Sequence, residues 1–201
     1  MSQSFTCPSC GAPLEVEHRF SRTVVCAYCR QTSSITPEGL DPAGKGAELV
    51  GAPSMFAVGR SGRIHGRPFR VLGRLRYAYP GGFWDEWFLV TDDGDEIWLQ
   101  EDDGTFTAFE KEAISGALPP FEDVGVGSTI NVNGRSLFVT ETTEAMIQGG
   151  EGELRFLAIP GSDVCTVDGN AGGETLSIEY TPEEINLSRG RTIPVAALEL
   201  D

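Results

Sequence analysis

Four of the five cysteines stand in two pairs near the start of the chain. Cys7 and Cys10 form the first pair and Cys26 and Cys29 the second, with two residues inside each pair and fifteen between the pairs. This spacing is typical of a four-thiolate zinc site, because two intervening residues let one turn direct both sulfurs at a single tetrahedral ion. Four thiolates leave no open coordination position, so we expect the Zn²⁺ to be structural.

The same C-x-x-C spacing also serves thiol oxidoreductases, whose cysteine pair begins a helix. No helix-start signal follows either pair, and the short runs at 14–16 and 23–25 favour strands. Residues 5–33 resemble the zinc-ribbon superfamily, so we expect a zinc ribbon over residues 1–33. His18 lies between the pairs and is expected at the surface rather than on the metal.

Few other side chains offer catalytic chemistry. His18 and His65 are the only histidines, and Cys165, the single cysteine outside the pairs, has no histidine near it in sequence. No glycine-rich phosphate loop and no nucleophile elbow are present. We assign no catalytic residue and expect a non-enzymatic protein, with an unrecognised enzyme kept as an alternative.

The most aromatic part of the chain, residues 70–109, has the pattern of a β-meander. Its apolar runs are separated by short turns rich in Gly and Asp, which tolerate the backbone angles of hairpins. A turn centred on Gly81 would pair Tyr77 with Asp85 and Arg76 with Glu86. Asp85 would then lie on an aromatic face, where it needs either a structural partner or a bound cation. The candidate ligand-binding residues are Tyr77, Trp84, Asp85, Glu86, Trp87 and Trp98.

Charge is distributed unevenly along the chain. The net charge of the protein is −15, made of +5 over residues 1–79 and −20 over residues 80–201. A strongly acidic segment binds nucleic acid poorly, because phosphate affinity comes from cationic side chains. It suits a cationic partner or high solubility. The chain shows no signal peptide and no apolar run of the roughly 20 residues that span a bilayer, so we expect a cytoplasmic protein.

The remaining chain divides into a linker and two similar units. Residues 34–54 are rich in Gly and Pro and predict a flexible linker. The phrase around Gly59 and Gly66 returns around Gly127 and Gly134, which indicates a degenerate internal repeat. We expect an all-β fold with two tandem units, 55–118 and 119–201, each a small barrel or curled sheet.

Several phrases also resemble a known family. They are VGRSGRIHGRPFRVLGRLRY, GFWDEWFLVTDDG, EIWLQEDDG, EGEL and LSIEYTPEEINLSRGR, which together lie within residues 50–200. These phrases are similar to an uncharacterised bacterial family, domain of unknown function 4178, in which a preceding zinc ribbon is common. The resemblance implies no reaction or ligand. It implies a genomic context of polyamine-synthesis enzymes and relatives of a phage-shock membrane-stress protein.

Two functions are compatible with these observations. The first is an accessory protein whose zinc ribbon and β-domain dock to a protein partner, in a membrane-stress or polyamine-related assembly. The second is a small-cation module that holds a polyamine between aromatic rings and carboxylates. A concave open face centred on Asp85 would favour the second, whereas packing of Trp87 and Trp98 into a core would exclude that face.

Overall fold

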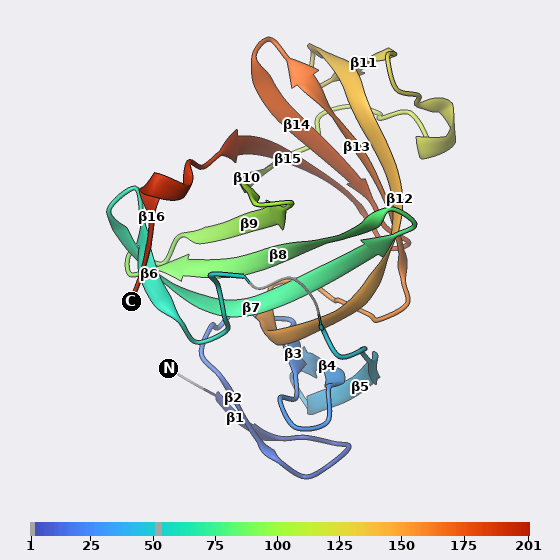
Figure 1. Cartoon of the computed structure of the whole chain (residues 1–201). Coiled ribbons are helices and arrows are strands. Elements are labelled where there is room, and N and C mark those ends of the chain that lie inside the picture. The colour runs from blue at the N-terminus through green and yellow to red at the C-terminus, as the bar shows by residue number, and fades with distance from the viewer. Residues whose placement is uncertain (1–2, 51–53) are drawn as a thin grey trace.

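The computed structural model describes residues 3–50 and 54–201, and its regular elements are almost all β-strands (Figure 1). The strands are β1 (Gln3–Thr6), β2 (Pro13–Val16), β3 (Thr23–Val25), β4 (Gln31–Thr36), β5 (Gly39–Lys45), β6 (Ser61–Ile64), β7 (Arg67–Tyr79), β8 (Gly82–Thr91), β9 (Glu96–Asp102), β10 (Thr105–Glu112), β11 (Thr129–Val132), β12 (Arg135–Leu154), β13 (Asp163–Ala171), β14 (Glu174–Tyr180), β15 (Ile185–Thr192) and β16 (Leu198–Leu200). Two 3-10 turns, η1 (Phe121–Asp123) and η2 (Val195–Ala197), complete the elements. The prediction of an all-β fold is confirmed.

Eight antiparallel strands close into one barrel. Their order is β7-β8-β9-β10-β15-β14-β13-β12, and β12 pairs back onto β7. Strands β7 to β10 come from the first predicted unit and β12 to β15 from the second. Each unit alone would leave two unpaired edge strands, which pairing between the units removes. The two units therefore share one barrel instead of forming one each.

The internal repeat is visible in the backbone. The hairpins β6–β7 and β11–β12 turn at His65-Gly66 and Asn133-Gly134, whose φ angles are +49°, +77°, +52° and +79°. Positive φ at both turn residues gives the hairpin turn that matches the right-handed twist of strands. Strands β7 and β12 both have an irregular register at positions 68 residues apart, after Val71 and after Val139. The two halves are thus related by repetition in structure as well as in sequence.

The expected strand register is wrong by one residue. In the β7–β8 hairpin Tyr79 pairs with Gly82, so the turn lies at Pro80-Gly81 rather than being centred on Gly81. Tyr77 consequently pairs with Trp84, and Arg76 with Asp85. A shift of one residue exchanges the two faces of a strand.

The predicted flexible linker, residues 34–54, is largely ordered. Strands β4 and β5 form a hairpin, and β3 joins them to the barrel by pairing Val25 with Gly152 of β12. Of the Gly and Pro residues that suggested a linker, Pro37 lies in the hairpin turn, and Pro42 and Gly44 flank the irregular pairing of β5. Residues 51–53 of that stretch lie outside the described residues. We call residues 3–45 the cysteine module; Figure 1 shows it beside the lower part of β7 and β12.

Apolar clusters lie on both surfaces of the barrel wall. Inside, Leu75, Phe88 and Leu154 belong to one cluster. Outside, one cluster around Trp87 is covered by Phe56, Ile64 and Leu198, and another around Ile178 is covered by Val124 and Val132. Because apolar side chains pack outside the barrel, its interior can accommodate polar ones. Within the part of the chain that the structure describes, no helix has the length and apolar character needed to cross a membrane.

Candidate functional site

The four paired cysteines lie together at one end of the cysteine module. Each pair sits in a turn closed by a backbone hydrogen bond, from Gly11 N–H to Cys7 O at 3.0 Å and from Arg30 N–H to Cys26 O at 2.8 Å. The residue after each pair has positive φ, +76° at Gly11 and +59° at Arg30. Gly11 adopts this conformation without steric strain because it has no Cβ, whereas Arg30 adopts it at an energetic cost.

The sulfur positions fit a tetrahedral ion. The Sγ atoms of Cys7 and Cys29 are 3.7 Å apart, as are those of Cys10 and Cys26. All four Sγ atoms lie within 4.8 Å of one another. A metal with bonds of about 2.3 Å to sulfur places tetrahedral ligands about 3.8 Å apart, whereas a disulfide needs about 2.05 Å. The cluster could hold a metal ion, as the spacing of the cysteines predicts.

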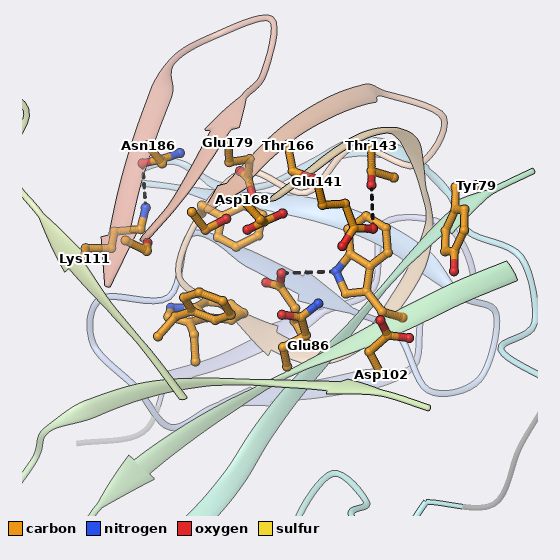
Figure 2. Close-up of a pocket in the computed structure, with 17 residues that line it drawn as sticks. Tyr79, Glu86, Asp102, Lys111, Glu141, Thr143, Thr166, Asp168, Glu179 and Asn186 are labelled. Atoms are coloured by element: carbon orange, nitrogen blue, oxygen red, sulfur yellow. Dashed lines mark hydrogen bonds between the residues drawn. The ribbon is translucent and has the colours of Figure 1, made fainter. Parts of the chain in front are cut away.

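A second candidate site is a cavity of about 100 Å³ inside the barrel (Figure 2). Five carboxylates and one lysine face it, together with aromatic and small polar side chains. The lining residues are Tyr79, Trp84, Glu86, Trp98, Gln100, Asp102, Phe109, Lys111, Glu141, Thr143, Phe156, Thr166, Asp168, Ser177, Glu179, Asn186 and Ser188. Figure 2 shows Glu86 between Asp168 and Glu179 on one side and Asp102 on the other.

The two halves of the barrel contribute different walls to this cavity. In the first half, Phe88, Trp98 and Phe109 are cross-strand neighbours on β8, β9 and β10. Their positional counterparts in the second half are Asp168, Ser177 and Ser188 on β13, β14 and β15. The correspondence follows from Gly73 and Glu141, 68 residues apart, which pair with Phe88 and Asp168. At these positions the first half is therefore aromatic and the second half polar and acidic, although Glu86 and Asp102 of the first half also line the cavity.

The aromatic wall is made rigid by ring contacts. Tyr77 stacks on Trp84 with ring centroids 4.9 Å apart, and Phe88 stacks on Trp98 at the same distance. Phe156 packs against Trp98 at 5.1 Å. Such ring pairs fix the orientation of the faces that a ligand would contact.

Glu86 is a poorly compensated carboxylate of the cavity. Its side chain is half-buried, and its one hydrogen bond comes from Trp84 Nε1 at 3.4 Å. Burial, together with the nearby charges of Glu179 and Asp168, raises the pKa of Glu86 to about 8. Burial also raises the pKa of Asp168 to about 6 and that of Glu179 above its usual range.

Lys111 is the single cation among the lining residues that the structure describes. Its Nζ donates to Asn186 Oδ1 at 2.9 Å, and it lies exposed at one side of the cavity, as Figure 2 shows. One lysine against five carboxylates leaves the cavity with excess negative charge. A cavity of this kind attracts cations.

Two of the predicted ligand-binding residues lie elsewhere. Asp85 faces the outside of the barrel wall and is bound by Arg76 Nε at 2.8 Å, Arg76 Nη2 at 2.7 Å and Arg74 Nη2 at 2.8 Å. Trp87 lies beside it in the outer cluster, 1% exposed, and donates to Glu101 at 2.8 Å. An open face centred on Asp85 is therefore absent, because the two arginines satisfy this carboxylate.

The other four predicted residues lie together on the inner face. Trp84, Glu86 and Trp98 line the cavity, and Tyr77 supports it through its stack on Trp84 and a 3.4 Å hydrogen bond to Glu179. Sequence reasoning missed the acidic wall. Ser177 and Glu179 alternate with buried Leu176 and Ile178 along β14, a pattern that usually places polar residues in solvent. The alternation predicts that β14 has one polar and one apolar face. Only closure of the barrel decides whether the polar face lies inside or in solvent.

Comparison with known proteins adds a family but no activity. Residues 57–195 match the family model described as Domain of unknown function (DUF4178). No curated protein matches the chain, and no solved structure matches it. The match covers both halves of the barrel and leaves the cysteine module outside.

Proposed function

Because the chain belongs to the DUF4178 family, whose description assigns no activity, we propose its function from the cavity itself: the barrel binds a small organic cation. The observation that carries this proposal is Glu86, a half-buried carboxylate to which the described residues supply no ion pair, and which faces two further carboxylates with raised pKa values. An ammonium group bound there supplies the missing charge.

The shape and lining of the cavity define the class of cation. Cation–π attraction to Trp84 and Trp98 favours a positive group close to their faces. A volume of about 100 Å³ fits a slender alkylammonium chain better than a bulky quaternary ion. The exposed carboxylates Asp102 and Glu141 extend the negative surface towards solvent. A polyamine, with several ammonium groups along an alkyl chain, matches this distribution.

Titration calorimetry with spermidine tests the proposal. Glu86→Gln should weaken binding at least about tenfold, since it removes the central charge. Glu110→Gln is the matched control, because Glu110 lies on β10 but is exposed and pairs with Arg189 on the surface at 3.0 Å. Equal affinities of the two variants would contradict the proposal. So would the absence of binding to the unmodified protein.

We further propose that the bound metal is Zn²⁺ with a structural role. Four cysteine ligands favour Zn²⁺, and they leave no open position for a substrate. The ion would be held by Cys7, Cys10, Cys26 and Cys29 alone. Metal analysis of the purified protein should give about one zinc per chain, and Cys29→Ser should reduce it.

A docking function is the second candidate, favoured by one surface. Tyr28, 76% exposed, and Val58, 39% exposed, border a groove of about 650 Å³ between the cysteine module and the barrel. Exposed aromatic side chains beside a groove are frequent anchors for protein partners. A phage-shock-type partner is implied only by the family resemblance. Co-purification of a stoichiometric partner should be lost in Tyr28→Ser and kept in Phe138→Ser, which is 52% exposed on β12.

A further inference from the structure

We propose that the metal of the cysteine module controls how tightly one side of the barrel cavity is closed. The contacts that lead to this proposal belong to residues 17–22, here called the plug segment, between β2 and β3. The proposal does not depend on which cation the cavity binds.

Glu153 of β12 anchors the plug segment. Its carboxylate, 5% exposed, accepts hydrogen bonds from the backbone N–H of Glu17 at 2.6 Å and of His18 at 3.0 Å, and from Ser21 Oγ at 2.8 Å. A buried carboxylate needs such donors, because no water is there to solvate it. The barrel therefore holds the segment at three points through one side chain.

Side chains of the plug segment pack directly beneath the cavity wall. The His18 ring lies 5.5 Å from Phe88 in an edge-on arrangement, and its Nε2 is 3.6 Å from Glu96. Phe88 in turn stacks on Trp98, which lines the cavity. The expectation that His18 lies at the surface is wrong, since its side chain is only 13% exposed.

The backbone beyond β12 is held by the same part of the chain. Arg22 N–H donates to Leu154 O at 2.9 Å, Thr23 Oγ1 donates to Phe156 O at 2.7 Å, and Ala158 N–H donates to Thr23 Oγ1 at 3.2 Å. These bonds fix Phe156, which packs on Trp98 and lines the cavity. Phe156 is therefore held by Thr23, the first residue of β3, which directly follows the plug segment.

The cysteines hold the other ends of the strands that flank the plug segment. Strand β2 follows Cys10 and strand β3 leads to Cys26, and the Sγ atoms of these two cysteines are 3.7 Å apart. A metal bound there ties both flanking strands together and closes the loop that contains the plug segment. Without it, the segment is held only by its contacts to the barrel and by the pairing of β3 with β4 and β12.

Hydrogen exchange on the full chain, with and without a strong chelator under reducing conditions, tests the proposal. Removing the metal should speed exchange at residues 17–22 and at Ala158 by at least about tenfold. Amides in β13 and β14, which Figure 1 shows at the opposite end of the molecule from the cysteine module, should stay protected. Unchanged exchange at Ala158 while the module exchanges freely would overturn the proposal. Loss of protection throughout β13 and β14 would also overturn it, since the effect would then be global unfolding.

A second variant separates the plug segment from the metal. Glu153→Gln should speed exchange at Ala158 while the protein retains its metal, as measured by metal analysis. Glu151→Gln is the matched control, because Glu151 is on the same strand but its side chain is 48% exposed. Equal exchange in the two variants would show that Glu153 does not anchor the plug segment, and would contradict the proposal.

Discussion

Asp85 and Glu86 are adjacent on β8, yet their carboxylates lie in opposite electrostatic environments. Asp85 faces outward and meets two arginines, and their hydrogen bonds lower its pKa despite burial. Glu86 faces inward and meets other carboxylates, and burial raises its pKa to about 8. A strand presents consecutive side chains to opposite faces, so one residue can be structural while its neighbour remains uncompensated.

This contrast shows how a structural carboxylate differs from a candidate binding one. The charge of Asp85 is already neutralised within the chain, so a ligand could add nothing there. The charge of Glu86 is unfavourable in the empty cavity and becomes favourable when a cation enters. Raised pKa values are common at functional sites for this reason.

The largest expected effect comes from removing the charge of Asp85, the carboxylate that two arginines neutralise. Asp85→Asn removes the carboxylate that the buried Arg74 and Arg76 share, and should lower the free energy of unfolding by about 3–5 kcal/mol. Glu86→Gln should not lower it and should raise it somewhat, because a neutral amide removes the cost of a carboxylate whose pKa is raised to about 8. Urea unfolding at pH 7 measures both. Similar losses in the two variants would refute the contrast between the two carboxylates.

The second prediction concerns ligand affinity against pH. Glu86 must lose its proton to hold a cation, and its pKa in the free protein is about 8. Spermidine should therefore bind more tightly as pH rises from about 6 to 8, by up to about tenfold per pH unit. Calorimetry in buffers with different heats of ionisation should detect proton release. A flat affinity profile would indicate that Glu86 does not contact the ligand.

The third prediction concerns stability without ligand. The folded-state pKa of Glu86, about 8, lies above the ordinary value of 4.5, so the folded protein holds the proton more strongly. Its contribution to stability is complete below pH 4.5 and is lost as pH rises through about 8. The pKa of Asp85 is lowered, so its contribution is present above pH 3.8 and is lost in stronger acid.

Thermal unfolding between pH 3 and 9 should show both effects. The unmodified protein should lose stability between pH 5 and 8, and Glu86→Gln should reduce that loss. Addition of spermidine should oppose it. If the unfolding temperature of Glu86→Gln depended on pH in the same way as that of the unmodified protein, another group would be the cause of the pH dependence.

The smallest expected effect is at a solvent-exposed carboxylate. Glu110 pairs with Arg189 at 3.0 Å, with side chains 69% and 41% exposed. Glu110→Gln should change the free energy of unfolding by less than about 1 kcal/mol, because water and salt screen such pairs. Urea unfolding checks this value beside Asp85→Asn. A loss comparable to that of Asp85→Asn would mean that burial does not explain the difference.

The sequence predicted local features well. The cysteine cluster and the repeated phrases around Gly66 and Gly134 depend on residues close together in the chain, and their spacing alone identified them. The all-β class followed from turn residues and alternating apolar runs in the same way. These features need no knowledge of how distant strands pair.

Features that depend on strand pairing were harder to predict. Moving the first turn by one residue exchanged the faces of Asp85 and Glu86, so four of the six candidate residues were grouped with two that face outward. Asp168 and Glu179 were missed because their strands alternate like solvent-facing ones. Only the pairing of β10 with β15 and of β7 with β12 places them inside a barrel.

The two seams between the halves also bear on the origin of the barrel. β7 with β12, and β10 with β15, are pairs of corresponding strands that run antiparallel, as strands related by a two-fold axis do. Two copies of a half-length ancestor would close the same barrel as a homodimer. In such a dimer every substitution appears in both walls at once. Aromatic positions facing acidic ones therefore require two copies whose sequences can differ, as the two halves of this chain do.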